Sequence, residues 1–339
     1  MYIPNNNIFK WIGGKKWLSN DIKNKLKLLS NENHIDVYIE PFTGGLGSFK
    51  SILPTLIEKN VKNIILNDIN TLVINTFINI KNNIEEFKKE YLKIEKDFRS
   101  QFSQEKLLCI KQIKIDGEYK AVKDYYNYFE LNKTRDKEQL KNTFLIKPRD
   151  YFDKVKKDFN ENKLNNNITI KTTAQFLFIM QNCFNGVYRE NKKGEFNIPY
   201  NWNSTLSNLD NKIKDLEEYN ILFNQVNITF SNKDVFELLE EHKNKNNVFI
   251  YLDPPYLNID GGENKYNKDH FGYNEQIKLL NYTKNFKYVL YSNHNHRIIK
   301  DFFNKENNIS IQEVFRKNIM SSSNASRQDD KSELLIFKY

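Results

Sequence analysis

The chain is poor in cysteine and has no long apolar run. Its two cysteines, Cys109 and Cys183, exclude a disulfide framework and a zinc site built from cysteine alone. No stretch of eighteen apolar residues is present, which excludes a transmembrane helix and a membrane partner. The N-terminus also lacks the charged and then apolar layout of a secretion signal. We therefore expect a cytoplasmic protein in a reducing, intracellular compartment.

Histidine and arginine are also scarce. The five histidines are not spaced with acids or cysteines as metal ligands are, so we expect no metal site. Only seven of the 52 basic residues are arginine. In such a lysine-rich chain, an arginine indicates a need for its forked, bidentate donors. This argument applies to Arg189, Arg297, Arg316 and Arg327.

The net charge of +9 favours a polyanionic partner. Asparagine, lysine and isoleucine are all abundant, however, as the codons of an A/T-rich genome would produce. The charge alone therefore leaves a nucleic-acid partner and a codon bias both open.

The hydrophobic pattern predicts an α/β domain. Residues 37–39 and 63–66 read as strands on either side of a helix at 47–59, and this alternation places ligand sites where strands end. The same alternation of apolar strands and helices recurs late in the chain. The strands expected there are residues 227–230, 248–252 and 288–291, followed by a hairpin from 314–315 and 334–337.

Residues 81–225 differ, with long segments rich in Lys, Glu and Asn at helical spacing. Helices are expected at 85–102, 119–131 and 174–184. We therefore predict a doubly wound, Rossmann-like domain made of residues 1–80 and 226–339. A mostly helical insert at 81–225 would lie beside the active-site edge of its sheet.

The sharpest motif is Asp253-Pro254-Pro255-Tyr256, directly after an apolar strand. The two prolines lack N–H donors and fix an extended exit from the strand. The Asp253 carboxylate and the Pro254 carbonyl then form two fixed acceptors beside the flat ring of Tyr256. This cluster suits a planar amine with two hydrogens. An ordinary turn at the end of a strand is the alternative, because aspartate and proline favour turns.

Three weaker motifs accompany this tetrapeptide. Residues 40–47 form a glycine-rich turn between a strand and a helix, where a ligand can approach the backbone closely. Asp68 ends the next strand and is either an acid that binds ribose hydroxyls or a helix N-cap. Near the N-terminus, residues 9–15 combine Trp11, a Gly-Gly turn and Lys15.

Residues 182–200 read as the end of a helix followed by a hairpin, with Lys193-Gly194 at or near the turn. This segment carries Asn185, Arg189 and Asn191. Such side chains read base edges in the major groove, where arginine binds guanine and asparagine binds adenine. A charged surface hairpin without a ligand is the alternative.

Taken in order, these motifs resemble the Dam-like, or D12 class, adenine-specific DNA methyltransferases. The resemblance covers most of the chain, including segments 8–16, 38–49, 64–70, 181–200, 251–256, 290–293 and 316–335. It implies a Rossmann-like, S-adenosylmethionine-dependent methyltransferase domain split by a helical target-recognition insert with a β-hairpin. One departure is Leu46, where many members have glycine, so the turn is expected to differ locally.

The resemblance also implies roles for single residues in catalysis and cofactor binding. Asp253, Pro254, Pro255 and Tyr256 match the catalytic tetrapeptide, and Asp253 also borders the cofactor. The remaining cofactor positions would be Trp11 and Lys15 in the N-terminal motif, Phe42 and Gly44 over the methionine part, Asp68 at the ribose, and Asp234 near the adenine amine.

For DNA, Asn185 and Arg189 match the recognition hairpin of the family, and we add the neighbouring Asn191. Arg316 and Arg327 lie on either side of the serine-rich segment 321–323, and we expect them to hold a phosphate near the flipped base. The partner is therefore double-stranded DNA, which would place the protein at the nucleoid.

We predict an adenine-specific DNA methyltransferase that acts on a flipped base, by direct transfer and without a metal or covalent intermediate. A cytosine amine, RNA, a protein amide, or a binding module without catalysis are the alternatives. Attack on a cytosine ring is excluded, because it needs a Pro-Cys nucleophile that the chain lacks. We expect a monomer in solution, either solitary or paired with a restriction endonuclease that cuts the same site.

Overall fold

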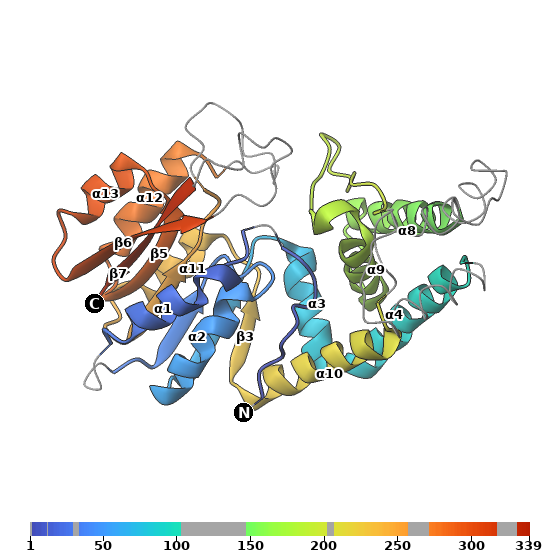
Figure 1. The fold of residues 1–339 in the computed structure, drawn as a ribbon, viewed down its shortest axis with the longest axis horizontal. Coiled ribbons are helices and arrows are strands. Elements are labelled where there is room, and N and C mark those ends of the chain that lie inside the picture. Colours follow the sequence, from blue (N-terminus) through green and yellow to red (C-terminus); the bar gives the residue numbers. More distant parts are fainter. Residues whose placement is uncertain are drawn as a thin grey trace, which may run out of the picture. The chain divides into compact units, whose positions relative to one another are not determined.

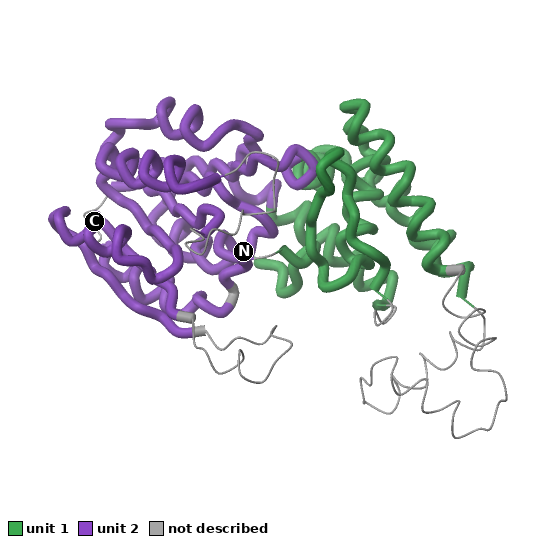
Figure 2. The backbone as a smooth tube through the Cα atoms, turned by 90° about the horizontal axis from the view of Figure 1, so that it is seen from above, with its two compact units in different colours: residues 1–12, 75–222 green, residues 13–74, 223–339 purple. Residues whose placement is uncertain are grey.

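The computed structural model describes residues 2–11, 13–29, 34–102, 147–201, 207–256, 271–316 and 331–339. Contacts divide the chain into two compact units (Figure 2). The sheet unit contains residues 13–74 and 223–339, and the helical unit contains residues 1–12 and 75–222.

The sheet unit is built on seven strands in the order β3-β2-β1-β4-β5-β7-β6 (Figure 1). The strands are β1 (Val37–Glu40), β2 (Asn63–Asn67), β3 (Ile228–Ser231), β4 (Val248–Leu252), β5 (Tyr288–His294), β6 (Ile309–Arg316) and β7 (Lys331–Lys338). Strands β1 to β5 pair in parallel, whereas β7 runs antiparallel to both β5 and β6. The strand order reverses between β1 and β4, which is where ligands bind in such sheets.

Helices cover both faces of this sheet (Figure 1). Helices α11 (Val235–His242), α12 (Tyr273–Thr283) and α13 (Arg297–Phe303) share one buried core with β1, β4, β5 and β7. On the other face, Tyr38 of β1 contacts Phe249 of β4 and Phe49 of α2 (Gly47–Glu58), which packs on α1 (Ser19–Leu26). A short 3-10 helix, η1 (Lys16–Leu18), precedes α1. The central strand β4 is apolar throughout because both of its faces are buried.

The helical unit holds α4 (Ile84–Arg99), α8 (Lys147–Leu164) and α9 (Ile170–Asn182), with most of α3 (Thr71–Asn82) and α10 (Leu209–Gln225). The 3-10 helix η3 (Phe184–Gly186) follows α9. The core of the helical unit is aromatic, and Phe98 alone contacts Phe102, Tyr151, Phe178 and Tyr200. No helix in the described part of the chain is long and apolar enough to cross a membrane.

The Rossmann-like α/β fold is confirmed, with the expected strands present and the late hairpin longer than predicted. Helices α4 and α9 correspond to the expected helices at 85–102 and 174–184, whereas residues 119–131 lie outside the described residues. Residues 1–12 group with the helical unit, although we predicted them as part of the Rossmann-like half. The reason is aromatic packing, because Phe9 stacks on Phe77 and contacts the edge of Phe176.

Candidate functional site

Four neighbouring strands of the sheet unit end next to residues that the sequence singled out. Phe42 and Gly44 follow β1, Asp68 follows β2, Asp234 follows β3, and Asp253 follows β4. These strands are parallel and adjacent in the sheet, so their carboxyl ends meet at one edge. The structure therefore brings these predicted residues to the same edge of the same unit.

Asp68 joins the ends of β1 and β2. Its carboxylate accepts the backbone N–H of Gly44 at 2.9 Å and that of Asn70, also at 2.9 Å. Burial raises the pKa of Asp68 to about 6, although the two backbone donors oppose this shift. Asp68 is thus more than a helix cap, because it also fixes the glycine turn over the sheet edge.

The glycine turn keeps a left-handed backbone where the sequence has leucine. Leu46 has φ of 65° and is fully buried, and its N–H donates to the carbonyl of Thr43 at 3.0 Å. A side chain in this conformation is disfavoured by about 1–2 kcal/mol relative to glycine. This position therefore combines a leucine side chain with a left-handed backbone.

Glu40, the last residue of β1, is fully buried and was not assigned a role from the sequence. The Tyr38 and Ser48 hydroxyls donate to its two oxygens, each at 2.6 Å. Burial raises the pKa of Glu40 to about 8, and the charges of Asp253 and Asp68 act in the same direction. Burial therefore disfavours the charged form of Glu40 in the folded protein.

Asp234 caps helix α11 with its carboxylate, which accepts the N–H of Phe236 at 2.8 Å, and its side chain is exposed. The buried amide of Asn67 holds this loop by donating to the carbonyls of Pro41 and Lys233. Asn67 was missed from the sequence because its role depends on contacts between three strand ends.

Three half-buried phenylalanines form an apolar wall beside these acids. The Phe236 and Phe271 rings are nearly parallel at 6.4 Å, and the edge of Phe42 meets Phe271 at 5.5 Å. Only Phe42 was expected at the site. The other two come from α11 and from the turn before α12, whose sequences carry no motif.

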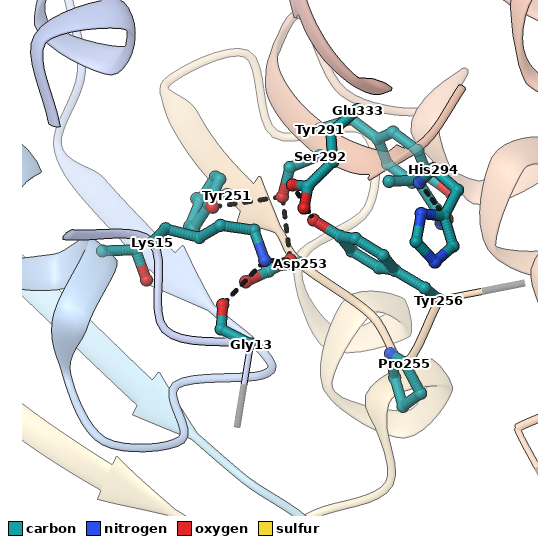
Figure 3. Close-up of polar contacts among 12 residues, drawn as sticks. Gly13, Lys15, Tyr251, Asp253, Pro255, Tyr256, Tyr291, Ser292, His294 and Glu333 are labelled. Atoms are coloured by element: carbon teal, nitrogen blue, oxygen red, sulfur yellow. Dashed lines mark hydrogen bonds and ion pairs between the residues drawn. The ribbon is translucent and has the colours of Figure 1, made fainter. Parts of the chain in front are cut away.

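Asp253 is paired with a buried lysine (Figure 3). Lys15, only 2% exposed, places its Nζ 3.0 Å from Asp253 Oδ1 and donates to the Gly13 carbonyl at 2.7 Å. The Ser292 hydroxyl donates to the same Oδ1 at 2.9 Å. Burial raises the pKa of Asp253, whereas the Lys15 charge and these hydrogen bonds oppose the shift. Among the described residues both contacts engage Oδ1, so Oδ2 remains for a ligand.

The rest of the tetrapeptide is also held in place. Gln276 of α12, which is buried, donates its amide to the Pro255 carbonyl at 2.6 Å. The Tyr256 hydroxyl donates to Glu333 at 2.6 Å, and Lys15 Nζ lies 4.5 Å from the centre of the Tyr256 ring. The tetrapeptide therefore presents its groups from a fixed backbone rather than from a loose turn.

The recognition residues predicted from the sequence lie in the helical unit. A turn at 191–194 closes the expected hairpin, with Glu190 bridged to Phe196 and Gly194 in the left-handed region. Arg189 is exposed, and its Nε donates to Asn197 Oδ1 at 2.9 Å. The hairpin thus displays Arg189 on its exposed face.

The two asparagines of this hairpin differ from each other. The Asn191 side chain accepts the N–H groups of Lys193 and Glu195 and donates to the Glu195 carboxylate, so it stabilises the turn. Asn185 is exposed and has φ of 58° within η3. A base contact from Asn191 would have to compete with its bonds in the turn, whereas Asn185 has no such side-chain bond within the described hairpin.

The other predicted residues are placed as follows. Trp11 lies in the helical unit, where its ring stacks on Tyr188 at 6.1 Å. The Arg316 backbone ends β6, opposite Lys331 of β7, and its side chain lies outside the described part of the chain, as does Arg327 entirely. Within the described residues, no group of three or more His, Cys, Asp or Glu side chains is arranged to hold a metal.

Comparison with known proteins places this arrangement in a family. The family described as D12 class N6 adenine-specific DNA methyltransferase matches residues 11–137 and 111–316. The chain is 29% identical to the type II methyltransferase M.MjaIII of Methanocaldococcus jannaschii, over 97% of this chain and 98% of that protein. It is 22% identical to the type II methyltransferase M1.LlaDCHI of Lactococcus lactis subsp. cremoris, over 97% and 94% of the two chains.

Proposed function

Because the chain belongs to the D12 class N6 adenine-specific DNA methyltransferases, we propose that its sheet unit methylates the exocyclic amine of an adenine flipped out of double-stranded DNA. The single observation that carries this proposal is the Asp253 carboxylate. It is held through Oδ1 by Lys15 and Ser292 at the end of β4, with Oδ2 remaining for the amine. The methyl donor proposed is S-adenosylmethionine.

The residues of the sheet edge fit this cofactor. Asp68 is a half-buried carboxylate whose raised pKa reflects a need for further donors, and ribose hydroxyls would supply them. Asp234 is exposed beside the wall of Phe42, Phe236 and Phe271, which suits a flat, apolar ring with an amine. When bound, the cofactor supplies an activated methyl group on a positively charged sulfur.

The chemistry requires the target amine to become a nucleophile. Its lone pair is delocalised into the adenine ring, so the ground-state amine is flat and unreactive. Asp253 Oδ2 and the Pro254 carbonyl would accept the two amine hydrogens, which favours the pyramidal geometry of the transition state. The reaction then needs positioning rather than a covalent intermediate or a metal.

The base must leave the DNA stack to reach this edge. Tyr256 would stack on it, and such a base–aromatic contact contributes roughly 1–3 kcal/mol. In the helical unit, Arg189 would bind a guanine through its terminal nitrogens, with Asn185 beside it, while lysines contact phosphates. Because the relatives named above are type II methyltransferases, we include in the proposal a partner restriction endonuclease for the same site. The enzyme itself would act as a monomer.

Replacing Asp253 with alanine tests the function. Single-turnover methyl transfer from tritiated S-adenosylmethionine to DNA should fall by about a hundredfold or more, because an acceptor used in the transition state is lost. DNA binding should be retained. Asp301→Ala, an exposed aspartate on α13, is the matched control. Circular dichroism checks that both variants are folded, and a rate near that of the wild type in a folded Asp253→Ala would contradict the assignment.

A further inference from the structure

Tyr256 is held from two sides by the β5–β7 ladder. Its hydroxyl donates to Glu333 Oε2 of β7 at 2.6 Å, and its ring meets the edge of the His294 ring of β5 at 4.5 Å (Figure 3). His294 and Glu333 lie directly opposite each other in the antiparallel register of the two strands. These two residues therefore contact Tyr256 from adjacent positions on neighbouring strands.

Glu333 is an almost completely buried carboxylate on β7. It is 7% exposed, and the next four residues of β7, Leu334 to Phe337, are completely buried. A carboxyl group in such a place is unfavourable unless it is hydrogen-bonded. The Tyr256 hydroxyl supplies that bond at 2.6 Å. The hydrogen bond between Tyr256 and Glu333 is therefore a buried structural contact rather than a contact between exposed side chains.

Tyr256 keeps the proton with which it donates to Glu333. Burial, followed by the charges of Asp253 and Glu333, raises the pKa of Tyr256 well above its usual value. The hydroxyl thus keeps its proton and continues to donate to Glu333. With the hydroxyl fixed and the ring edge against His294, rotation about the tyrosine side-chain torsions is restricted.

We propose that Glu333 is a positioning residue for methyl transfer, which fixes the plane of the Tyr256 ring so that a base stacked on it presents its amine to Asp253. The inference rests on the proposed function, in which Tyr256 stacks on the flipped adenine. The energetic reason is that catalysis depends on near-attack geometry, and a misplacement of about 1 Å can cost a hundredfold in rate. A ring free to turn would misplace the base in this way.

Glu333→Ala and Tyr256→Phe test the contact from its two ends in the full-length protein. Each should lower the single-turnover methylation rate about tenfold or more. The double variant should be no slower than the slower single variant, because both changes break the same bond. Glu333→Gln keeps a carbonyl acceptor and should recover most of the rate. Glu313→Ala, an exposed glutamate of the neighbouring strand β6, is the matched control.

A fluorescent base separates positioning from a merely structural role. 2-Aminopurine at the target position reports whether the base is flipped and stacked, so Glu333→Ala should change its fluorescence in the complex while calorimetric affinity for S-adenosylmethionine stays the same. Additive rate losses in the double variant, or an unchanged fluorescence signal, would overturn the inference. If the wild type itself does not methylate adenine in DNA, the proposed function fails. If the wild type methylates adenine in DNA and Glu333→Ala does so at the same rate, only the proposed role of Glu333 fails.

Discussion

Glu40 should make the stability of the sheet unit depend strongly on pH. Its carboxyl group is completely buried, and in the described part of the chain no ion pair joins it to a cation. Hydroxyls of Tyr38 and Ser48 donate to it, yet burial still raises its pKa to about 8. The informative perturbation is Glu40→Gln, which removes the ionisation and keeps the size, with one acceptor oxygen replaced by an amide donor that one of the two hydroxyls must accept.

The sign and size of this pH dependence follow from the pKa values of Glu40 in the unfolded and folded chain. The ordinary value of 4.5 applies to the unfolded chain, so the folded state binds the proton more tightly. Stability is then fully present below pH 4.5 and is lost as pH rises toward about 8. At about 1.4 kcal/mol per pH unit, the free energy of unfolding loses roughly 2–3 kcal/mol between pH 5 and pH 7, and roughly 5 kcal/mol in total.

Urea unfolding at several pH values, followed by circular dichroism, measures this loss. The wild type and Glu40→Gln share every other titrating group, so the difference between their curves isolates Glu40. From pH 5 to pH 7, the free energy of unfolding of the variant should rise by roughly 2–3 kcal/mol relative to that of the wild type. Glu58→Gln, which makes the same change on the exposed surface of α2, should give no such gain. Parallel curves for Glu40→Gln and the wild type would refute the reasoning.

Two further predictions concern ligands. Asp68→Ala should weaken S-adenosylmethionine binding in calorimetry, and the wild-type affinity should fall as pH drops through about 6, because protonation removes the acceptor. An unchanged dissociation constant would leave Asp68 as a turn-fixing residue only. Arg189→Lys should cost about 1–3 kcal/mol of discrimination at one base pair in a panel of varied duplexes. Lys192→Ala should instead weaken all sequences alike and reduce the salt slope by about one. An equal loss on every duplex would make Arg189 a phosphate-binding or structural residue.

The positions of Asp68 and Asp253 could be predicted because each follows an apolar strand directly, whereas Asp234 was assigned from the family resemblance. Parallel strands that are buried on both faces give continuous apolar runs, and their carboxyl ends converge. Asp68 and Asp253 were therefore found from local sequence alone. The grouping of residues 1–12 with the helical unit could not be predicted, because the aromatic packing of Phe9 depends on Phe77 and Phe176, which are distant in the sequence.

The supporting residues could not be found in this way. Glu333 follows Tyr256 by 77 positions, and the two meet only because β7 inserts between β5 and β6 in the antiparallel sense. Gln276 similarly reaches Pro255 from a helix whose sequence resembles any amphipathic segment. The hairpin is intermediate, because its turn was readable from Gly194, whereas the use of Asn191 within that turn emerges only from its hydrogen bonds.

The buried carboxyl groups of the sheet edge suit the cationic cofactor that we propose. Glu40, Asp68 and Asp253 are all buried enough for their pKa values to be raised, and Lys15 pairs with only one of them. Each carboxyl group is therefore less stable as an anion than it would be in water. A positively charged sulfur nearby would stabilise the anions of Asp68 and Asp253. These buried carboxyl groups would therefore bind a sulfonium cofactor more tightly than the neutral product that remains after methyl transfer. Weaker binding of the product would assist its release.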